Sequence, residues 1–328
     1  MLSPGMFWGG GTPKLLALVG TTYVAYTYDY QNWTQTPNLS LNYDVLSKGI
    51  AYNPTDKLVM LSNYVTNVSF ASHRTRTTNV GTFDKKATYT LRSSPSGYIP
   101  STGKLKYDYG KWLWGDINTR VAMSSDNGVT WTGFNTWGSS ATRNPSIVRY
   151  FNSAARYITC YPNVQQIGVS ASGSFNTGGI WSVTSTGFTN QTRFVEEGTT
   201  GNFLALGGSS TVGQIATSTN LTSWTVRTWI TGTPLPNWAA WNGTKWVVVA
   251  NGGNIATSTD GITWTKETSP VAGNLLWVDW STDENQFVAV GDNMIVITSP
   301  DGVTWTQLSV VGTNFSLTVV PFQIVRIR

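Results

Sequence analysis

The chain has very few of the residues from which disulfides, metal sites and proton-transfer sites are built. Its 328 residues include one cysteine, one histidine and only 11% charged residues. A single cysteine, Cys160, excludes an intrachain disulfide, and a single histidine, His73, excludes a histidine-rich metal site. A Ser-His-Asp triad would depend on His73 alone, which lies in a polar stretch. We therefore expect neither a metal nor a cofactor.

Long runs of one residue class are also missing. No apolar run approaches the ~20 residues that span a bilayer, so we expect no membrane insertion. The net charge of +5 is spread along the chain and Lys85-Lys86 is the longest basic run, which argues against nucleic-acid binding. Residues 1–8 lack a positive region followed by an apolar stretch, so we expect no secretory signal.

What the chain has is a repeat. The string at 255–264 returns at 296–305 with the same Thr-Ser, Asp-Gly and Thr-Trp pairs, and weaker copies run back to the N-terminus. The copies end on aromatic residues spaced 40 to 50 residues apart: Trp33, Phe83, Trp131, Phe175, Trp224, Trp264 and Trp305. A period of ~40–50 residues is that of a four-stranded propeller blade.

Each copy contains four short runs rich in Val, Ile, Thr and Trp, separated by Gly, Asn and Asp; residues 274–308 show them most clearly. Such runs favour strands, and Asp-Gly between two of them indicates a hairpin turn. The prediction is an all-β fold, a single domain over 1–328: a seven-bladed β-propeller of four-stranded antiparallel blades, with the repeated motif between the third and fourth strands. Residues 315–328 are left over and predict a strand that closes onto blade one.

Residues 124–131 carry the full pattern Ser/Thr-x-Asp-x-Gly-x-Thr-Trp. This motif resembles the Asp-box of the BNR-repeat, sialidase-like propellers. The copies that end at Trp264 and Trp305 are one residue shorter, which is also common in propellers that resemble photosystem assembly factors.

The carboxylate or amide of the motif accepts hydrogen bonds from its own turn, and the closing aromatic packs between blades. One acidic oxygen donor per turn is too few for a calcium loop. These residues are therefore assigned structural roles: Asp29, Asn79, Asp126, Asn220, Asp260, Asp301, Trp33, Trp131, Trp224, Trp264 and Trp305.

The resemblance to sialidases implies three arginines that hold a sugar carboxylate, the first in an Arg-Ile-Pro motif. That motif is absent, and no arginine precedes Arg74. Glutamates number only four, and two-carboxylate hydrolysis needs a pair about 5–10 Å apart. A hydrolase remains an alternative, because Glu196 and Asp279 would meet at the channel.

Binding has more support than catalysis. The predicted first strands, which line the channel, carry aromatic and charged side chains, and long polar loops (34–46, 84–103, 132–145 and 176–191) face away from the repeated turns. Loops on a rigid scaffold commonly carry binding sites. Candidate ligand-binding residues on that face and in the channel are Trp137, Arg149, Trp181, Arg193, Trp238 and Asp279. The alternative is that the tryptophans only pack between blades.

A polar, weakly charged composition without an export signal suits a particle component released by cell lysis. The expectation is a non-enzymatic structural or binding component of a phage virion, such as a tail, fibre or decoration protein, assembled in the host cytoplasm. Its expected partners are other virion proteins and host-surface glycans, with several copies in each particle. The alternatives are a sialidase-like glycoside hydrolase and a propeller similar to photosystem assembly factors.

Overall fold

The computed structural model describes most of the chain, with the longest unbroken stretch in the C-terminal half. The described residues are 14–19, 23–35, 46–56, 58–64, 72–76, 86–89, 104–115, 120–126, 132–135, 147–161, 164–171, 181–199, 201–209, 211–232, 234–313 and 321–326. None of the helices in these ranges is long and apolar enough to cross a membrane.

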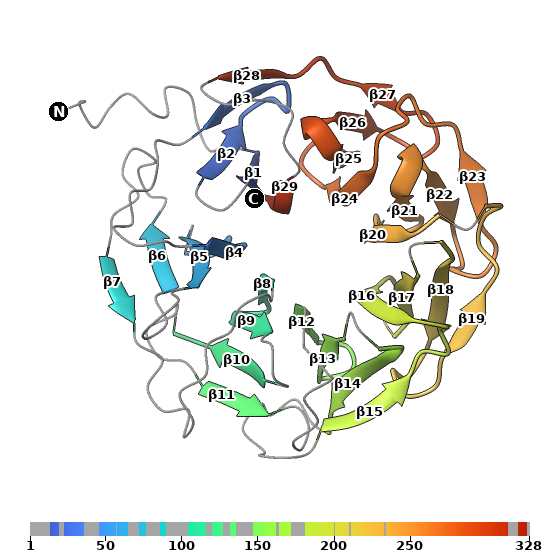
Figure 1. Cartoon of the computed structure of the whole chain (residues 1–328), viewed down its shortest axis with the longest axis horizontal. Helices are drawn as coiled ribbons and strands as arrows, with labels where there is room; N and C mark the ends of the chain where they lie inside the picture. Colours follow the sequence, from blue (N-terminus) through green and yellow to red (C-terminus); the bar gives the residue numbers. More distant parts are fainter. Residues whose placement is uncertain are drawn as a thin grey trace.

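Seven β-sheets, counted over the described residues, stand side by side around a central channel (Figure 1). Neighbouring strands within a sheet are antiparallel, apart from one parallel pair. This ring is the architecture of a β-propeller, so the prediction of an all-β propeller is confirmed. Six sheets have four strands, as predicted, and the first has five.

From the channel outward, the first sheet contains β29 (Pro321–Arg326), β1 (Leu15–Val19), β2 (Tyr23–Thr27), β3 (Asn32–Gln35) and β28 (Val311–Thr313). The second contains β4 (Leu46–Asn53), β5 (Leu58–Tyr64), β6 (Ser72–Arg76) and β7 (Lys86–Tyr89). The third contains β8 (Leu105–Asp108), β9 (Lys111–Gly115), β10 (Arg120–Ser124) and β11 (Thr132–Asn135). The fourth and fifth contain β12 (Ile147–Phe151), β13 (Arg156–Cys160), β14 (Gln166–Ser170) and β15 (Trp181–Ser185); and β16 (Gln191–Glu197), β17 (Phe203–Gly208), β18 (Gly213–Ser218) and β19 (Thr225–Arg227).

The sixth and seventh sheets contain β20 (Pro236–Trp241), β21 (Trp246–Ala250), β22 (Ile255–Ser258) and β23 (Thr265–Glu267); and β24 (Leu275–Ser281), β25 (Gln286–Gly291), β26 (Val296–Ser299) and β27 (Thr306–Gln307). Two short 3-10 turns, η1 (Asn251–Gly253) and η2 (Asp292–Met294), follow β21 and β25.

Burial follows a strand's position in its sheet. Every residue of β17 and β21 is buried, because these second strands pack against neighbouring sheets on both faces. Inner strands such as β16 alternate buried residues with partly exposed ones that face the channel, and the outer strands β19 and β23 are mostly exposed. Apolar burial between neighbouring sheets is thus the main force that holds the ring together.

The C-terminal strand β29 occupies the innermost position of the first sheet, where it pairs antiparallel with β1. Its Gln323 side chain also reaches the next two sheets. The Gln323 amide donates to the carbonyls of Ile50 and Leu105, both at 2.8 Å, and accepts from the Ile50 amide at 3.2 Å. One buried glutamine therefore connects three inner strands.

A second group of polar contacts connects the first sheet to the seventh. The carboxylate of Glu284, in the turn after β24, accepts hydrogen bonds from Lys14 and Tyr30 and lies 3.8 Å from the Arg326 guanidinium. Partial burial acts to raise the pKa of Glu284, but the hydrogen bonds from Lys14 and Tyr30 outweigh it and lower the pKa. Polar contacts therefore connect the first sheet to the sheets on both sides of it in the ring.

Four turns share one hydrogen-bonding scheme; we call residues 27–33, 218–224, 258–264 and 299–305 the repeated turns. In each, the carboxylate or amide oxygen of the third residue accepts two backbone N–H groups at 2.7–2.9 Å. The closing indole N–H donates to the carbonyl of the fourth residue at 2.8–3.1 Å. These contacts satisfy the turn's own polar groups, which is the role predicted for Asp29, Asn220, Asp260 and Asp301.

The fourth residue of each repeated turn has a positive φ, from 65° to 76°. Glycine takes this conformation at Gly261 and Gly302, but Tyr30 and Leu221 adopt it in the other two turns. A buried Leu221 side chain compensates for its backbone strain. In the related copy at 124–131, Ser124 donates to Asp126 at 2.7 Å; Trp131, and Asn79 in another copy, lie outside the described residues.

We expect Asp260→Ala to lower the free energy of unfolding by about 1 kcal/mol, because two N–H groups of an exposed turn lose their acceptor. Hydrogen bonds from the Thr263 and Ile262 amides lower the pKa of Asp260 to about 2. Its unfolded-state pKa is ~3.9, so the stabilisation is complete above about pH 4 and disappears as the pH falls towards 2. Urea unfolding at pH 7 and pH 2.5 measures this: equal differences between the wild type and the variant at both pH values would contradict it.

Candidate functional site

A cavity of about 580 Å³ lies at one end of the central channel. All seven inner strands, or the turns that follow them, contribute to its wall. The wall includes Pro54, Thr55, Tyr109 and Gly110, which lie in turns between the first and second strands of their sheets. These turns are on the same face of the ring as the repeated turns, because strands alternate in direction. The cavity is therefore on the repeated-turn face.

This position differs from the predicted one. We expected ligands to bind on the face opposite the repeated turns, where long loops connect successive sheets. Trp137 and most of those loops lie outside the described residues, so the predicted site on the opposite face stays a prediction. The cavity that the structure does describe is at the repeated-turn end of the channel, where short turns connect the first and second strands.

Arg149, a predicted ligand-binding residue, lies in the channel on β12 but already has two carboxylate partners. Its Nε donates to Asp108 Oδ2 at 2.9 Å, and its two Nη atoms donate to the two carboxylate oxygens of Glu196 at 2.8 and 3.0 Å. The exposed fractions of these side chains are only 13% to 20%. Burial disfavours the charge of Arg149, but Asp108 and Glu196 more than compensate and raise its pKa.

This group, the Arg149 triad, connects β8, β12 and β16. In addition, Asp108 accepts the backbone N–H of Tyr150 at 3.2 Å. The Nε and both Nη atoms of Arg149 thus each donate to a carboxylate oxygen. The triad, with one cation and two carboxylates, forms part of the cavity wall and does not present an uncompensated arginine to a ligand.

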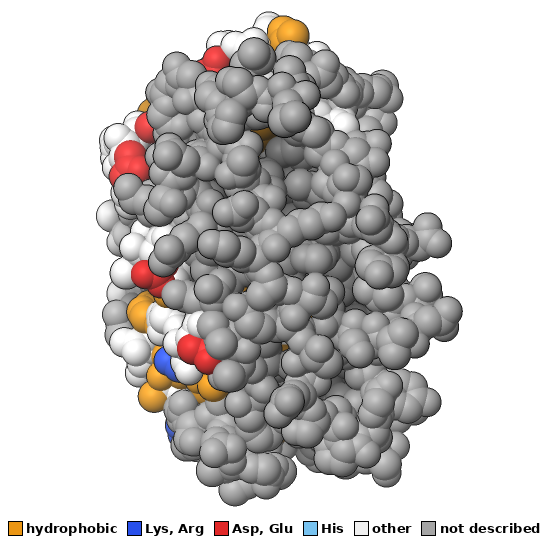
Figure 2. Space-filling view, turned by 90° about the vertical axis from the view of Figure 1, so that its left-hand side faces the viewer, with side chains coloured by type: hydrophobic (Ala, Val, Ile, Leu, Met, Phe, Trp, Pro, Cys, Tyr) orange, Lys and Arg blue, Asp and Glu red, His pale blue; other side chains and the backbone are white. Residues whose placement is uncertain are grey.

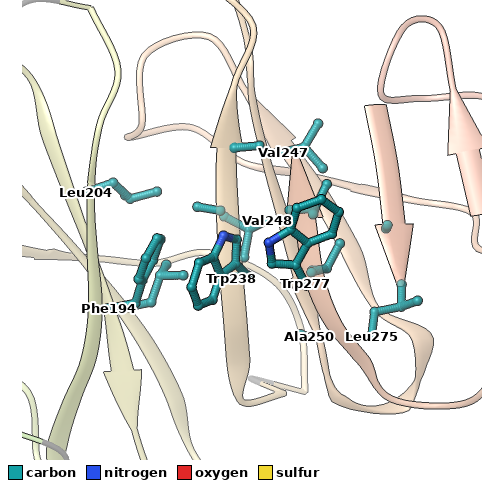
Figure 3. Packing of buried hydrophobic residues seen from close by; sticks show 14 of the residues in the cluster. Phe194, Leu204, Trp238, Val247, Val248, Ala250, Leu275 and Trp277 are labelled. Carbon is teal, nitrogen blue, oxygen red and sulfur yellow. The ribbon is translucent and has the colours of Figure 1, made fainter. Parts of the chain in front are cut away.

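Trp238, on β20, is buried and also borders the cavity. Figure 3 shows its indole facing the ring of Phe194 from β16, with centroids 4.1 Å apart and planes 26° apart. The ammonium groups of Lys104 and Lys106 lie over the same indole, 4.9 and 4.7 Å from its centroid. Trp238 therefore packs between sheets and also meets two cations from across the channel.

Arg193 and Asp279, the other two predicted channel residues, lie in different environments. Arg193 is the extra residue where β16 and β17 shift register, and its Nη1 donates to Asn237 Oδ1 at 3.3 Å. Asn237 is the extra residue of the equivalent shift in β20 and donates to the Leu275 carbonyl of the next sheet at 2.8 Å. Asp279, on β24, borders the cavity and accepts the Trp280 amide at 3.0 Å.

The prediction for Trp181 is wrong. We placed it in a loop on the face opposite the repeated turns, but it is the first residue of the outer strand β15 and is buried, with its ring 6.5 Å from that of Tyr157. It pairs with Ser170, as Trp33 pairs with Thr27. Trp181 therefore takes the place of the closing aromatic that we assigned to Phe175, because the turn in this copy is longer.

The arrangement offers binding groups more readily than catalytic ones. Glu196 and Asp279 both border the cavity, as the hydrolase alternative requires, but both Glu196 oxygens accept hydrogen bonds from Arg149. Within the described ranges, no group of three or more His, Cys, Asp and Glu residues is placed to hold a metal ion. Figure 2, a side view, shows acidic side chains among the coloured residues towards one rim of the ring.

Sequence reasoning did not single out Lys104, Lys106 and Asp108. Their spacing of two along a predicted first strand contained the signal, since alternate residues of a strand share one face. A second signal was also missed. Asp108 precedes Arg149 by 41 residues and Glu196 follows it by 47, so each carboxylate is about one repeat away from the arginine. Equivalent positions in adjacent repeats are neighbours in a ring.

No protein-family model matches the sequence, and no curated protein matches it. Solved structures do resemble it. One described as YCF48 bound to D1 peptide has a TM-score of 0.63 at 12% identity, over 89% of each chain. YCF48 from Cyanidioschyzon merolae has a TM-score of 0.59 at 12% identity, over 90% of this chain and 98% of the other.

The WD40 β-propeller domain of Doa1 is similar to the same degree, with a TM-score of 0.59 at 10% identity over 89% of this chain and 91% of that one. At such identities the likeness concerns the fold. The β-propeller architecture is common to all three.

Proposed function

We propose that the chain is a seven-bladed Asp-box β-propeller that acts as a non-catalytic binding protein and receives a segment of a partner protein in the channel cavity. The observation that carries the proposal is the cavity itself, to which all seven inner strands contribute. The wall of this site at the axis of the ring combines aromatic rings with polar groups, as ligand pockets commonly do.

Several features support binding over hydrolysis. A retaining or inverting glycosidase needs one protonated acid and a second carboxylate free to act on the sugar or on water. Here both Glu196 oxygens accept hydrogen bonds from Arg149, which also binds Asp108, so the Glu196 carboxylate is already engaged. A similar propeller, YCF48, has been solved with a bound peptide, which makes a peptide segment the first partner to test.

The setting that we propose is a phage virion, with the propeller as part of a tail, fibre or decoration protein. Its support is compositional: 11% charged residues together with 33 glycines and 16 tryptophans. Genes for portal, tail or capsid proteins beside the coding sequence would support this setting. A neighbourhood of photosystem genes would instead favour an assembly role similar to that of YCF48.

Thr55→Trp tests the site directly. Thr55 is exposed at the rim of the cavity, so a large side chain there narrows the entrance without disturbing the core. We expect peptides selected on the wild type from a random display library to bind this variant at least about tenfold more weakly. The matched control is Thr259→Trp, an exposed threonine in a repeated turn on the same face.

Equal peptide binding by the Thr55→Trp variant and the wild type would place the site elsewhere. Binding on a glycan array, without any selected peptide, would replace the protein partner with a glycan. Turnover of fluorogenic glycosides that is lost in Asp279→Asn would instead establish the hydrolase, since Asp279 is a carboxylate beside the cavity that is not a member of the Arg149 triad.

A further inference from the structure

Three cations from β8, the residue before it and β16 gather beside the cavity, and one of them, Lys106, lines it. Lys104, just before β8, and Lys106, within it, are two residues apart and therefore face the channel together. Arg193, on β16, is near enough to Lys104 for their charges to repel. All three side chains are partly buried, where solvent screens charge poorly. We call Lys104, Lys106 and Arg193 the channel cations.

The two lysines converge on one aromatic ring. Their ammonium groups are 4.9 and 4.7 Å from the centroid of Trp238, and the Phe194 ring covers one face of this indole at 4.1 Å. Both ammonium groups therefore approach the remaining face. Two like charges over a single ring gain cation–π attraction but repel each other, so an anion placed between them would be stabilised by both.

The channel cations are short of partners. Within the part of the chain that the structure describes, neither lysine ammonium group takes part in a hydrogen bond or ion pair, and the Arg193 guanidinium has one hydrogen bond, to Asn237 at 3.3 Å. The nearest carboxylates, Asp108 and Glu196, already hold Arg149. The Arg149 triad has one cation and two carboxylates, and its carboxylates attract Lys106, whereas only the positive charges of Lys106 and Arg193 act on Lys104. Uncompensated positive charge therefore lies at the Lys104 end of the channel cations.

The electrostatics of the lysines are consistent with this shortage. Burial is the main cause that lowers the pKa of both lysines to about 8. For Lys104, the other causes are the positive charges of Lys106 and Arg193, whereas Lys106 is partly compensated by Asp108, Glu196 and Asp279. An added anion would be felt most strongly at Lys104.

We propose that the channel cations form a carboxylate site, and that the partner segment received by the cavity ends in, or carries, an acidic group that passes Trp238 and lies between Lys104, Lys106 and Arg193. Lys106 and Trp238 both border the cavity, so the two sites are continuous. Asn237 adds a neutral polar group beside Arg193. This inference rests on the proposed function, because the acidic group belongs to the partner segment that enters the cavity. It specifies the chemical group by which that partner would be recognised.

The probe is acetyl-Gly-Gly-Glu with free carboxylates, compared with the neutral analogue acetyl-Gly-Gly-Gln-amide. Lysines are labelled by reductive 13C-methylation, which keeps their charge, and Lys104→Met and Lys106→Met assign the two channel signals in NMR titrations. We expect the acidic probe to raise both pKa values by at least about one pH unit, and the neutral analogue to leave them unchanged. Each lysine variant should bind the acidic probe about tenfold more weakly than the wild type.

Lys266→Met is the matched control, since Lys266 is exposed on the outer strand β23; its affinity should equal that of the wild type. Unchanged pKa values with the acidic probe, or unchanged affinity in Lys104→Met, would overturn the carboxylate site. Tighter binding of glucuronate or inorganic phosphate than of the peptide would also overturn it, as these would identify an acidic sugar or a phosphate ligand. If acidic and neutral peptides alike bound the wild type but not Thr55→Trp, and the acidic ones left the lysine pKa values unchanged, the carboxylate site would be rejected and the proposed function would stand.

Discussion

A chain that ends at residue 320 is expected to lose cooperative unfolding altogether. It lacks β29, and with it the innermost strand of the first sheet, the buried Ile324, and the Gln323 contacts to Ile50 and Leu105. Each buried backbone group left unpaired costs about 1–3 kcal/mol, and the whole stability of a domain is typically about 5–15 kcal/mol. Losing several such groups together with the apolar burial of a strand should therefore remove most of it.

Thermal and urea unfolding, followed by tryptophan fluorescence, measure this effect. A chain that lacks only residues 327–328 is the control, because it keeps β29 complete, and should unfold like the full chain. A synthetic peptide of residues 321–328, added to the truncated chain, should restore the transition in a concentration-dependent way. A sharp transition at the wild-type midpoint without the peptide would show that β29 is dispensable.

Arg149→Met is expected to have the second largest effect, a loss of about 3–5 kcal/mol in the free energy of unfolding. The variant leaves Asp108 and Glu196 facing each other without their shared cation, at side-chain exposures of 13% and 20%. The combination Arg149→Met, Asp108→Asn and Glu196→Gln removes both unpaired charges and should recover much of the loss. If the triple variant were no more stable than the single one, repulsion between the carboxylates would not be the cause.

The fold could be predicted because its determinants are local and repeated. The repeated turns form their hydrogen bonds within seven residues, so the sequence of each copy is enough to determine the conformation of its own turn. Strand-forming runs around each turn then specify one sheet per repeat. The predicted position of Trp181 was wrong because the turn of that copy is longer than the others. A pattern based on spacing chose the nearer aromatic residue, Phe175, as the closing aromatic.

The candidate site was harder to predict because it depends on contacts between sheets. Arg149 was correctly placed in the channel, but its carboxylate partners come from the sheets on either side, and only a comparison of equivalent positions in adjacent repeats would have found them. The lysines that meet Trp238 reach it from β8, across the channel from β20, and no spacing in the sequence encodes a contact across a closed ring.

The outer strands have a consequence for how copies of the protein tolerate crowding. The outermost strand of a sheet has unpaired N–H and C=O groups, which can pair with another molecule and start aggregation. β19 and β23 have three residues and β27 has two, too few for a stable intermolecular ladder. The longer β3 is covered by the parallel strand β28, itself three residues long. The edges of these four sheets are therefore poor templates for pairing between molecules, even at high local concentration.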